Sequence, residues 1–388
     1  MAEFPLFTEL DPAEVEPLRL GLRGSTCPVL ELDGRRIQGF YPWDYARWRE
    51  GRINDAFPAE PPVLGEGGPR VAWLSDLHLR EQNLEGSLSA IRALLERVKA
   101  DAVLLTGDVC EGPARLEETI RRLGTVVGQV WFVLGNHDFY GAGLAEVDAW
   151  RRTYAGPLLD YAVPIHLGDG VYLAGNGGWG GGFKPRRCAG IRDWQAIMEY
   201  KRILSVGEVL GEVSPDAKRA TLEALLKLAA ARASKLVAEA EGQLALLPAD
   251  ARHLIFATHV PVVRQASRYQ RRASDPELVA HFCWPEMGKR LAAFAETRPG
   301  LGITVLSGHT HTRAFAQVDG IQHAVAGAEY GEPRIAAVFT PGFFLNPAAK
   351  RAAALKAAFT YRAIRPHPCL KKYYQRIAER KRADAGRG

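Results

Sequence analysis

Five apolar segments of this chain are each followed at once by a short polar motif, and this pairing constrains the fold more than any other feature. Such apolar runs are typical of strands that are buried on both faces of a sheet. The segments are Val71–Ser75, Ala102–Thr106, Gln129–Leu134, Leu254–Ala257 and Ile303–Ser307. The motifs are Asp76-Leu77-His78, Gly107-Asp108, Gly135-Asn136-His137-Asp138, Thr258-His259 and Gly308-His309-Thr310-His311. Because side chains at the carboxyl ends of neighbouring strands converge on one crevice in open α/β sheets, the motifs predict one common site.

Strand and helix patterns alternate from Val71 onwards. Helices are predicted over about 84–99, 114–123 and 144–154, and a further strand near 171–174. This alternation predicts βαβ units and a largely parallel sheet. After Ile303 the pattern changes to short strands over 313–318, 321–326 and 334–339, which predict a second, more antiparallel sheet. We therefore expect an α/β fold of two sheets with helices outside them.

A long helical insertion interrupts this order over about 195–250, between two motif-bearing strands. Ser214 is a predicted N-cap, Pro215 takes the first helical position, and Pro248 ends the helix. The insertion is either a helix or hairpin that packs on the flank, or a cap over the active site that limits substrate size. We favour the cap, because the insertion has to leave and re-enter the body near strand ends.

The predicted core, residues 70–345, has an additional segment at each end. Residues 1–69 end in a linker rich in proline and glycine, and we expect them to form an N-terminal extension that packs on the core. Residues 346–388 are expected to form a basic, partly helical tail. Residues 350–388 contain twelve lysines and arginines but only two acidic residues, so their net charge is +10. The whole chain has a net charge of +6, and residues 1–349 therefore carry −4. Such a tail is either a solvated end or a surface for an acidic partner such as RNA or DNA.

The cysteines and the N-terminus indicate where the protein is located. The five cysteines are widely separated and never form a Cys-x-x-Cys pair, which favours a reducing compartment over a disulfide framework or a zinc ribbon. The first residues have neither a basic region nor a continuous apolar core, and no segment reaches the ~18 apolar residues of a membrane span. We expect a cytoplasmic protein without a transmembrane segment; the sequence predicts no oligomeric state.

The polar motifs supply oxygen and nitrogen ligands for a metal but no sulfur. A mixture of Asp and His without Cys suits Mn²⁺, Fe or Zn²⁺ better than Mg²⁺. Two metals about 3.5–4 Å apart need a bridging anion. Asp108 is the natural choice, because Gly107 lets the backbone turn sharply there, and Asn136 can add a neutral oxygen without adding charge.

Two of the motifs contain pairs of potential ligands two residues apart. Asp76 and His78 form one pair, and His309 and His311 form the other. Side chains two residues apart lie on the same side of an extended strand. Each pair is therefore expected to point the same way, provided that the strand end stays extended.

The five motifs, in this order, resemble those of the calcineurin-like metallophosphoesterases over about residues 71–339. This resemblance implies a four-layer α/β/β/α double β-sandwich of two mixed sheets flanked by helices. It also implies a dinuclear centre of two divalent transition-metal ions, whose identity it leaves open among Mn²⁺, Fe and Zn²⁺. One metal would be held by Asp76, His78, Asp108 and His311, and the other by Asp108, Asn136, His259 and His309.

The resemblance further implies that His137 is a catalytic residue outside both coordination spheres. His137 would contact a phosphate oxygen or protonate the leaving group, and Asp138 would orient it. A metal-activated hydroxide would attack phosphorus in line, without a covalent enzyme intermediate. His281 and His323 have no counterpart in the pattern and are interpreted as structural or surface residues.

The chain departs from the phosphoprotein-phosphatase branch directly after Asp108. That branch continues into an Asp-Arg-Gly segment with a phosphate-binding arginine, whereas this chain reads Val109-Cys110-Glu111-Gly112. Two basic clusters could replace the arginine, or could be solvated loops: Lys184, Arg186 and Arg187, and Arg264, Arg268, Arg271 and Arg272. We therefore expect a metal-dependent hydrolase of a small phosphodiester or phosphomonoester. The alternatives are a nuclease or RNA-processing phosphoesterase and, less favoured, a non-catalytic scaffold on the same fold.

Overall fold

The structure is a computed structural model, and it divides into two units. It describes residues 19–21, 29–32, 35–38, 60–181, 191–209, 215–269, 272–274, 279–328 and 333–360. One unit comprises residues 1–60 and 361–388, and the other comprises residues 61–360. The basic cluster at residues 184–187 and the part of the basic tail from residue 361 on lie outside the described residues.

The smaller unit contains a three-stranded antiparallel sheet. Its strands are β1 (Arg19–Gly21), β2 (Val29–Leu32) and β3 (Arg35–Gln38), and they pair in the order β1-β2-β3. The pairing of β2 with β3 extends to Leu32 and Arg35.

The first sheet of the larger unit carries the first three motifs. Its order is β4-β16-β5-β6-β7, with β5, β6 and β7 parallel to one another and β16 antiparallel to β5. The strands are β4 (Val63–Leu64), β5 (Val71–Leu74), β6 (Ala102–Thr106), β7 (Gln129–Val133) and β16 (Ile335–Phe339). We had expected β16 in the second sheet, and that expectation was wrong. β16 instead lies between β4 and β5, where most of its side chains are buried.

The second sheet carries the last two motifs. Its order is β14-β15-β13-β10-β9-β8, and the four central strands run parallel, with antiparallel strands only at its edges. The strands are β8 (Ile165–Gly168), β9 (Val171–Gly175), β10 (His253–Ala257), β13 (Gly302–Ser307), β14 (Ala314–Val318) and β15 (Ile321–Val325). The second sheet therefore has a larger antiparallel share than the first, as expected, although its centre is parallel. The hairpin of β14 and β15 is antiparallel, but β15 pairs parallel with β13.

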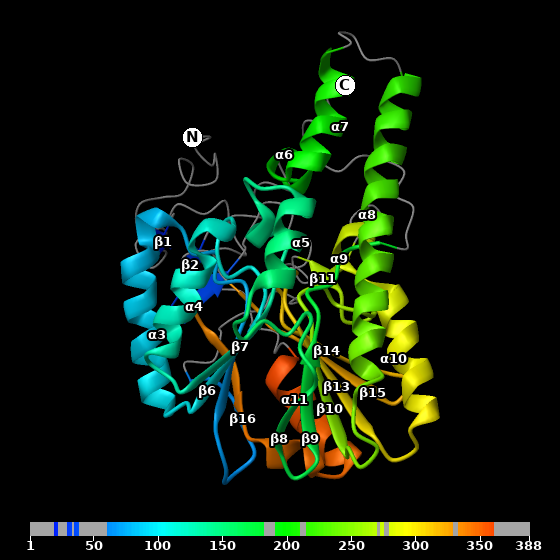
Figure 1. Ribbon diagram of the computed structural model, residues 1–388. Coiled ribbons are helices and arrows are strands. Elements are labelled where there is room, and N and C mark those ends of the chain that lie inside the picture. Colours follow the sequence, from blue (N-terminus) through cyan, green and yellow to red (C-terminus); the bar gives the residue numbers. More distant parts are fainter. Residues whose placement is uncertain are drawn as a thin grey trace, which may run out of the picture. The chain divides into compact units, whose positions relative to one another are not determined.

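Helices cover the outer faces of both sheets (Figure 1). On the first sheet these are α3 (Leu84–Val98), α4 (Leu116–Gly124) and α5 (Leu144–Thr153), and on the second α8 (Pro215–Leu244) and α10 (Pro285–Thr297). α11 (Ala348–Phe359) packs on β14 and β15. The shorter elements are α6 (Asp193–Ala196), α7 (Met198–Val209), α9 (Val279–Phe282), β11 (Arg268–Tyr269), β12 (Arg272–Ala273), η2 (Glu81–Asn83), η3 (Pro113–Arg115), η4 (His137–Phe139) and η5 (Pro341–Leu345). The two mixed sheets with outer helices confirm the predicted fold class.

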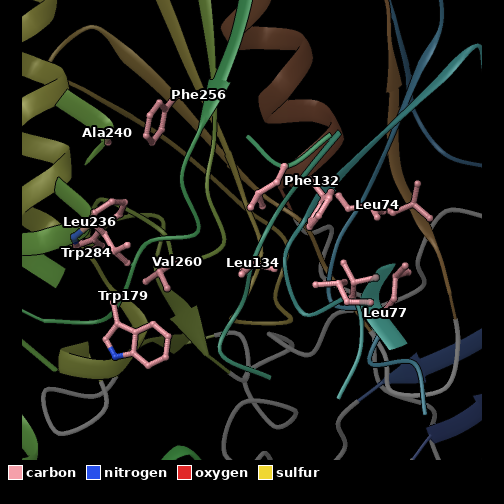
Figure 2. Packing of buried hydrophobic residues seen from close by; sticks show 14 of the residues in the cluster. Leu74, Leu77, Phe132, Leu134, Trp179, Leu236, Ala240, Phe256, Val260 and Trp284 are labelled. Atoms are coloured by element: carbon pink, nitrogen blue, oxygen red, sulfur yellow. The ribbon is translucent and has the colours of Figure 1, made fainter. Parts of the chain in front are cut away.

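The two faces of each sheet pack against different layers. In β5, Trp73 belongs to the apolar cluster that includes Ile255 and Ala257 of the second sheet, while Ala72 and Leu74 on either side of it belong to the cluster that includes the outer helices. The indole nitrogen of buried Trp73 donates a hydrogen bond to Thr106 at 2.9 Å, which satisfies its polar group inside the core. Figure 2 shows Leu74 and Phe132 within the same apolar cluster, which also contains Phe256 and residues of α8. This packing holds the strand ends, and hence the motifs, in fixed positions.

In the described part of the insertion the helices are α6, α7 and α8, and α7 extends beyond the ends of the strands (Figure 1). α8 begins at Pro215, as predicted, and ends at Leu244, before Pro248; the predicted N-cap Ser214 lies outside the described residues. The C-terminal half of α8 packs between β9 and α10. Whether the insertion caps the active site stays a prediction.

Candidate metal centre

The backbone leaves the strand conformation directly after each motif-bearing strand of the first sheet. Asp76, His78 and Asp108 have φ values of 52°, 46° and 51°, in the left-handed region. His309 and His311 do the same in the second sheet, with φ of 67° and 49°. The strand ends therefore do not stay extended, and the condition on which each pair was expected to point the same way is not met.

The left-handed residues are concentrated at this one place. Within the described ranges, eight residues other than glycine have a positive φ, and five of these are the candidate ligands just named. Such a conformation costs of order 1 kcal/mol or more per residue and persists only where the surroundings impose it. Here backbone hydrogen bonds impose it, from the nitrogen of Asp76 to the carbonyl of Gly107 at 3.0 Å and from that of His78 to the carbonyl of Asp108 at 2.9 Å.

Two glycines of the motifs allow the close approach of neighbouring loops. Gly107 has φ of 87°, and a Cβ there would lie 2.5 Å from the imidazole of His259. A Cβ on Gly135 would lie 2.1 Å from the carboxylate of Asp108. Side chains at these positions would push apart the strand ends that bring the candidate ligands together.

The first group of candidate ligands contains Asp76, His78, Asp108 and His311, whose ligand atoms all lie within 4.8 Å of one another. The Nε2 atoms of His78 and His311 are 2.9 Å apart. Nε2 of His311 lies 3.3 Å from a carboxylate oxygen of Asp76, and Nε2 of His78 lies 3.7 Å from Oδ2 of Asp108. These are the four residues that the resemblance assigns to one metal.

The second group contains Asp108, His259 and His309, again within 4.8 Å of one another. Nε2 of His259 lies 3.0 Å from Nδ1 of His309, 3.1 Å from Oδ1 of Asn136 and 3.4 Å from Oδ1 of Asp108. These four residues are the ones that the resemblance assigns to the other metal. Asp108 belongs to both groups and turns one carboxylate oxygen towards each.

The hydrogen bonds around the second group fix the tautomers of its imidazoles. Nδ1 of His259 lies 2.8 Å from the carbonyl of Thr106, and Nε2 of His309 lies 3.2 Å from the carbonyl of His281. A carbonyl oxygen only accepts, so these two nitrogens carry the protons of the neutral rings. The nitrogens that face each other are then both lone pairs, beside two oxygen acceptors. A cation fits this arrangement, because it is the group that four converging lone pairs can share.

The charges of the site favour the same conclusion. Burial would raise the pKa of Asp108, but His259 and His137 hold it well below its usual range. Burial would lower the pKa of His259, but the nearby carboxylate of Asp108 raises it to about 9. By contrast, burial and the neighbouring imidazoles lower the pKa values of His78 and His309. Asp108 is thus a buried carboxylate that attracts positive charge, and His78 and His309 beside it favour their neutral, metal-binding forms.

His137 lies beside the two groups, with its imidazole 4.3 Å from that of His78 between ring centres. Its Nε2 is 4.0 Å from Asp108, and its Nδ1 is 3.7 Å from a carboxylate oxygen of Glu111. Burial would lower the pKa of His137, but Asp108 and Glu111 raise it. Glu111 was not selected from the sequence, although it lies in the segment that follows Gly107-Asp108.

Asp138 is fully buried. The hydrogen bonds that its carboxylate accepts come from backbone nitrogens. It accepts hydrogen bonds from the backbone nitrogens of Cys110 at 2.9 Å and Gly135 at 2.8 Å. Burial and the charge of Asp108 raise its pKa to about 7. Asp138 thus ties together the two loops that follow β6 and β7, and its predicted role in orienting His137 stays a prediction.

Further residues near the centre could not be found from motifs. Asp193, at the start of α6, accepts hydrogen bonds from the side chains of Asn136 and Tyr140, each at 2.7 Å. His281, which was interpreted from the sequence as a structural or surface residue, lies 3.4 Å from Asp193 and thus beside the centre. His323 is buried in β15, as a structural residue would be.

Two arginines, Arg80 and Arg192, lie beside Glu111. Nη2 of Arg192 is 3.7 Å from the carboxylate of Glu111. Neither was selected from the sequence. Of the basic cluster after His259, Arg264 and Arg268 are exposed. No motif marks any of these side chains, because their partners are distant in the sequence.

Residues 69–313 match the calcineurin-like phosphoesterase family. The chain belongs to this family. Membership confirms the resemblance drawn from the five motifs and classes the chain with the phosphoester hydrolases.

Individual similar proteins are more distant from this chain. A protein of Danio rerio described as a transmembrane protein with a metallophosphoesterase domain is 28% identical over 101 residues, which are 25% of this chain and 22% of that protein. The match thus spans about a fifth of that relative's length. Within the described ranges of the present chain, no helix has the length and apolar character needed to cross a membrane.

Two solved structures are similar to this chain at low identity. A dimetal phosphatase from Danio rerio is 14% identical, with a TM-score of 0.40 over 68% of this chain and 88% of the other. A phosphopantetheinyl hydrolase from Mycobacterium tuberculosis is 15% identical, with a TM-score of 0.46 over 77% of this chain and 97% of the other.

Proposed function

We propose that this protein is a metal-dependent phosphoester hydrolase with a dinuclear centre. The observation that carries the proposal is the position of Asp108 between the two groups of candidate ligands. Its Oδ1 lies 3.4 Å from His259 and its Oδ2 lies 3.7 Å from His78, as a bridging carboxylate would. One metal would be held by Asp76, His78, Asp108 and His311, and the other by Asp108, Asn136, His259 and His309.

The chain's own residues would bind and protonate the substrate. Two divalent cations, when bound, would polarise the phosphoryl oxygens and lower the pKa of the attacking water. His137 is placed beside the centre and would donate a proton to the leaving-group oxygen, because Asp108 and Glu111 raise its pKa against the effect of burial and so favour the protonated imidazole. Glu111, 3.7 Å from Nδ1, would hold this proton donor in orientation.

The proposed substrate is a small phosphodiester or phosphomonoester. The segment Val109-Cys110-Glu111 replaces the arginine-bearing segment of phosphoprotein phosphatases, which favours another ester class. The proposed metals are Mn²⁺, Fe or Zn²⁺, since carboxylate, amide and imidazole ligands without thiolate suit these ions.

A purified, metal-reconstituted protein tests the proposal. It should contain about two transition-metal ions per chain and hydrolyse members of a panel of phosphomonoesters, phosphodiesters, cyclic nucleotides and oligonucleotides. Asp108→Ala should lose both metal and activity. Asp169→Ala is a matched control, because Asp169 has a φ of 53°, close to the 51° of Asp108, but is exposed in the turn between β8 and β9. Unchanged turnover in the Asp108 variant contradicts the mechanism.

A nuclease or RNA-processing enzyme is the second candidate, favoured by the charge of +10 in residues 350–388. Nucleic-acid phosphates bind basic segments with an affinity that falls steeply with salt. Salt-dependent binding to single-stranded and double-stranded nucleic acid, measured with the full chain and with a chain ending at residue 360, decides between the two candidates. No affinity in the full chain excludes the nuclease.

A further inference from the structure

Asn136 can serve as a metal ligand only if its amide oxygen, rather than its amide nitrogen, faces the centre. The two ends of an amide have the same shape, so the hydrogen-bond partners decide its orientation. On the inner side, Asn136 faces Nε2 of His259 at 3.1 Å. A ring nitrogen of histidine can either donate or accept, so this contact alone does not decide which end of the amide faces the centre.

The partner on the outer side decides the orientation. The amide nitrogen of Asn136 donates to Oδ1 of Asp193 at 2.7 Å, and Asp193 is buried at 1% exposure. An ionised carboxylate only accepts hydrogen bonds, so it requires the NH₂ end of the amide to point outwards. The oxygen is thereby turned towards His259 and the second group of candidate ligands.

The same carboxylate contacts two more residues that face the centre. Oδ1 also accepts the hydroxyl of Tyr140 at 2.7 Å, and the ring of Tyr140 lies 4.1 Å from that of His137 between centres. Oδ2 lies 3.4 Å from Nε2 of His281, whose own carbonyl binds Nε2 of His309. Asp193 thus connects a candidate ligand, the packing partner of the candidate acid, and the residue that fixes the tautomer of His309.

We propose that Asp193 is a positioning residue that orients the Asn136 amide for metal binding, with the help of His281. The inference rests on the proposed function, since it assigns a cause to one ligand of the proposed centre. Binding of the second metal would then depend on α6, a helix at the edge of the insertion that belongs to none of the five motifs. Partners that orient a ligand typically contribute 10–100-fold to metal affinity.

The test compares Asp193→Ala and Asp193→Asn with wild type in the full-length chain. Mn²⁺ binding is measured by calorimetry, and Co²⁺ binding is followed by visible absorption, which reports the ligands of the metal. We expect the first equivalent to bind with unchanged affinity and the second to bind about 10–100-fold more weakly in Asp193→Ala. The side chain introduced by Asp193→Asn keeps one acceptor oxygen for the Asn136 amide, so this variant should recover part of the lost affinity.

Activity provides a second readout of the same variants. A lost orientation should raise the metal concentration required for half-maximal activity, and excess metal should restore most of kcat in Asp193→Asn. Glu199→Gln is the matched control, because Glu199 also belongs to the insertion and its carboxylate also accepts two hydrogen bonds, from the backbone of Leu144 and Ala145. Its metal affinities should equal those of wild type.

The outcomes separate this inference from the proposed function. Two equivalents bound with wild-type affinity by both Asp193 variants overturn the positioning role, even if their activity falls. Equal weakening in Glu199→Gln also overturns it, because the effect then belongs to the insertion as a whole. Failure of wild type to bind two metals refutes the proposed dinuclear function instead. If Asp193→Ala does not fold, which circular dichroism detects, Asp193→Asn alone decides.

Discussion

The imidazoles of His78 and His311 face each other through their Nε2 atoms at 2.9 Å, although 233 residues separate them in the sequence. Each ring comes from the end of a strand in a different sheet, and each backbone is held in the left-handed region. Two neutral imidazoles at this distance share at most one hydrogen bond, whereas a cation held by the two Nε2 atoms and the carboxylates beside them would use both lone pairs.

Metal binding should therefore stabilise the folded protein. A ligand that binds only the folded state adds about 2.7 kcal/mol to the free energy of unfolding at a concentration 100 times its Kd. Thermal denaturation of chelator-treated protein, with and without added Mn²⁺ or Zn²⁺, measures this effect. His311→Ala should bind one metal more weakly and show a smaller rise in Tm. An equal rise in that variant contradicts the assignment of His311.

His137→Ala should lower kcat by about 10²–10⁴-fold, the usual contribution of a general acid. The metal content should remain at the wild-type level, because His137 is not a proposed ligand. The decrease should be largest for esters with poor leaving groups, since these need the proton most. Parallel measurements on nitrophenyl and alkyl esters show the difference, and equal rates in variant and wild type remove the proposed acid role.

Local patterns predicted the elements of the larger unit well, but not which strands pair. β6 was predicted with its observed bounds, because a strand buried on both faces leaves an apolar run that flanking polar residues end. The sheet to which β16 belongs was predicted wrongly, since pairing depends on distant segments: β16 lies beside β5. Burial of a strand leaves a mark in its sequence, whereas the identity of its neighbour does not.

The candidate ligands were predictable because each stands at a fixed position after a strand, in a family pattern. Asp193 and His281 carry no such mark. Their relation to the centre depends on how α6 and α9 fold back over the strand ends, and single polar residues of this kind are usually solvated. Glu111 could have been found, since the segment after Asp108 was recognised as unusual and contains one carboxylate.

Arg151→Ala should destabilise the fold by about 3–5 kcal/mol, because it removes the cation that is paired with the buried carboxylate of Asp160. Arg151 is 2% exposed and binds Asp148 at 2.8 Å, Asp160 at 2.7 Å and Glu239 of α8 at 2.9 Å. Urea denaturation measures the change. The adjacent exposed Arg152 is the control, and its replacement by Ala should change stability by less than about 0.5 kcal/mol. Similar values for the two variants exclude the buried network as a major contributor.

Two glycine substitutions should have opposite effects on stability. Gly135→Ala places a methyl group 2.1 Å from the carboxylate and 2.4 Å from the backbone nitrogen of Asp108, so it should lower both stability and metal affinity. Gly242 lies within α8 with no atom within 4 Å of an added Cβ, so Gly242→Ala should stabilise the protein by up to about 1 kcal/mol. Chemical denaturation distinguishes the two, and a neutral Gly135→Ala would show that the loops can move apart freely.

Acid should destabilise the fold through two buried histidines remote from the motifs. Burial, with a smaller contribution from the charge of Arg351, lowers the pKa of His253 from 6.5 to about 3, and burial lowers that of His323 from 6.5 to about 4. Below pH 6.5 the unfolded chain binds protons that the folded chain does not bind. The contribution of these groups is therefore complete above pH 6.5 and decreases as the pH falls towards 4, by about 1.4 kcal/mol per pH unit for each histidine.

Urea denaturation between pH 7.5 and 4.5 measures this dependence, and single variants isolate each histidine from the carboxylates that titrate nearby. Between pH 6 and 4.5, His253→Gln should reduce the slope of the free energy of unfolding against pH by the equivalent of about one proton. This variant also loses the hydrogen bond to Thr304, so its stability is lower at the start. His166→Gln is the control, because His166 is exposed on β8, and its curve should run parallel to that of wild type. A wild-type slope in His253→Gln would mean that this imidazole takes up its proton without unfolding the protein.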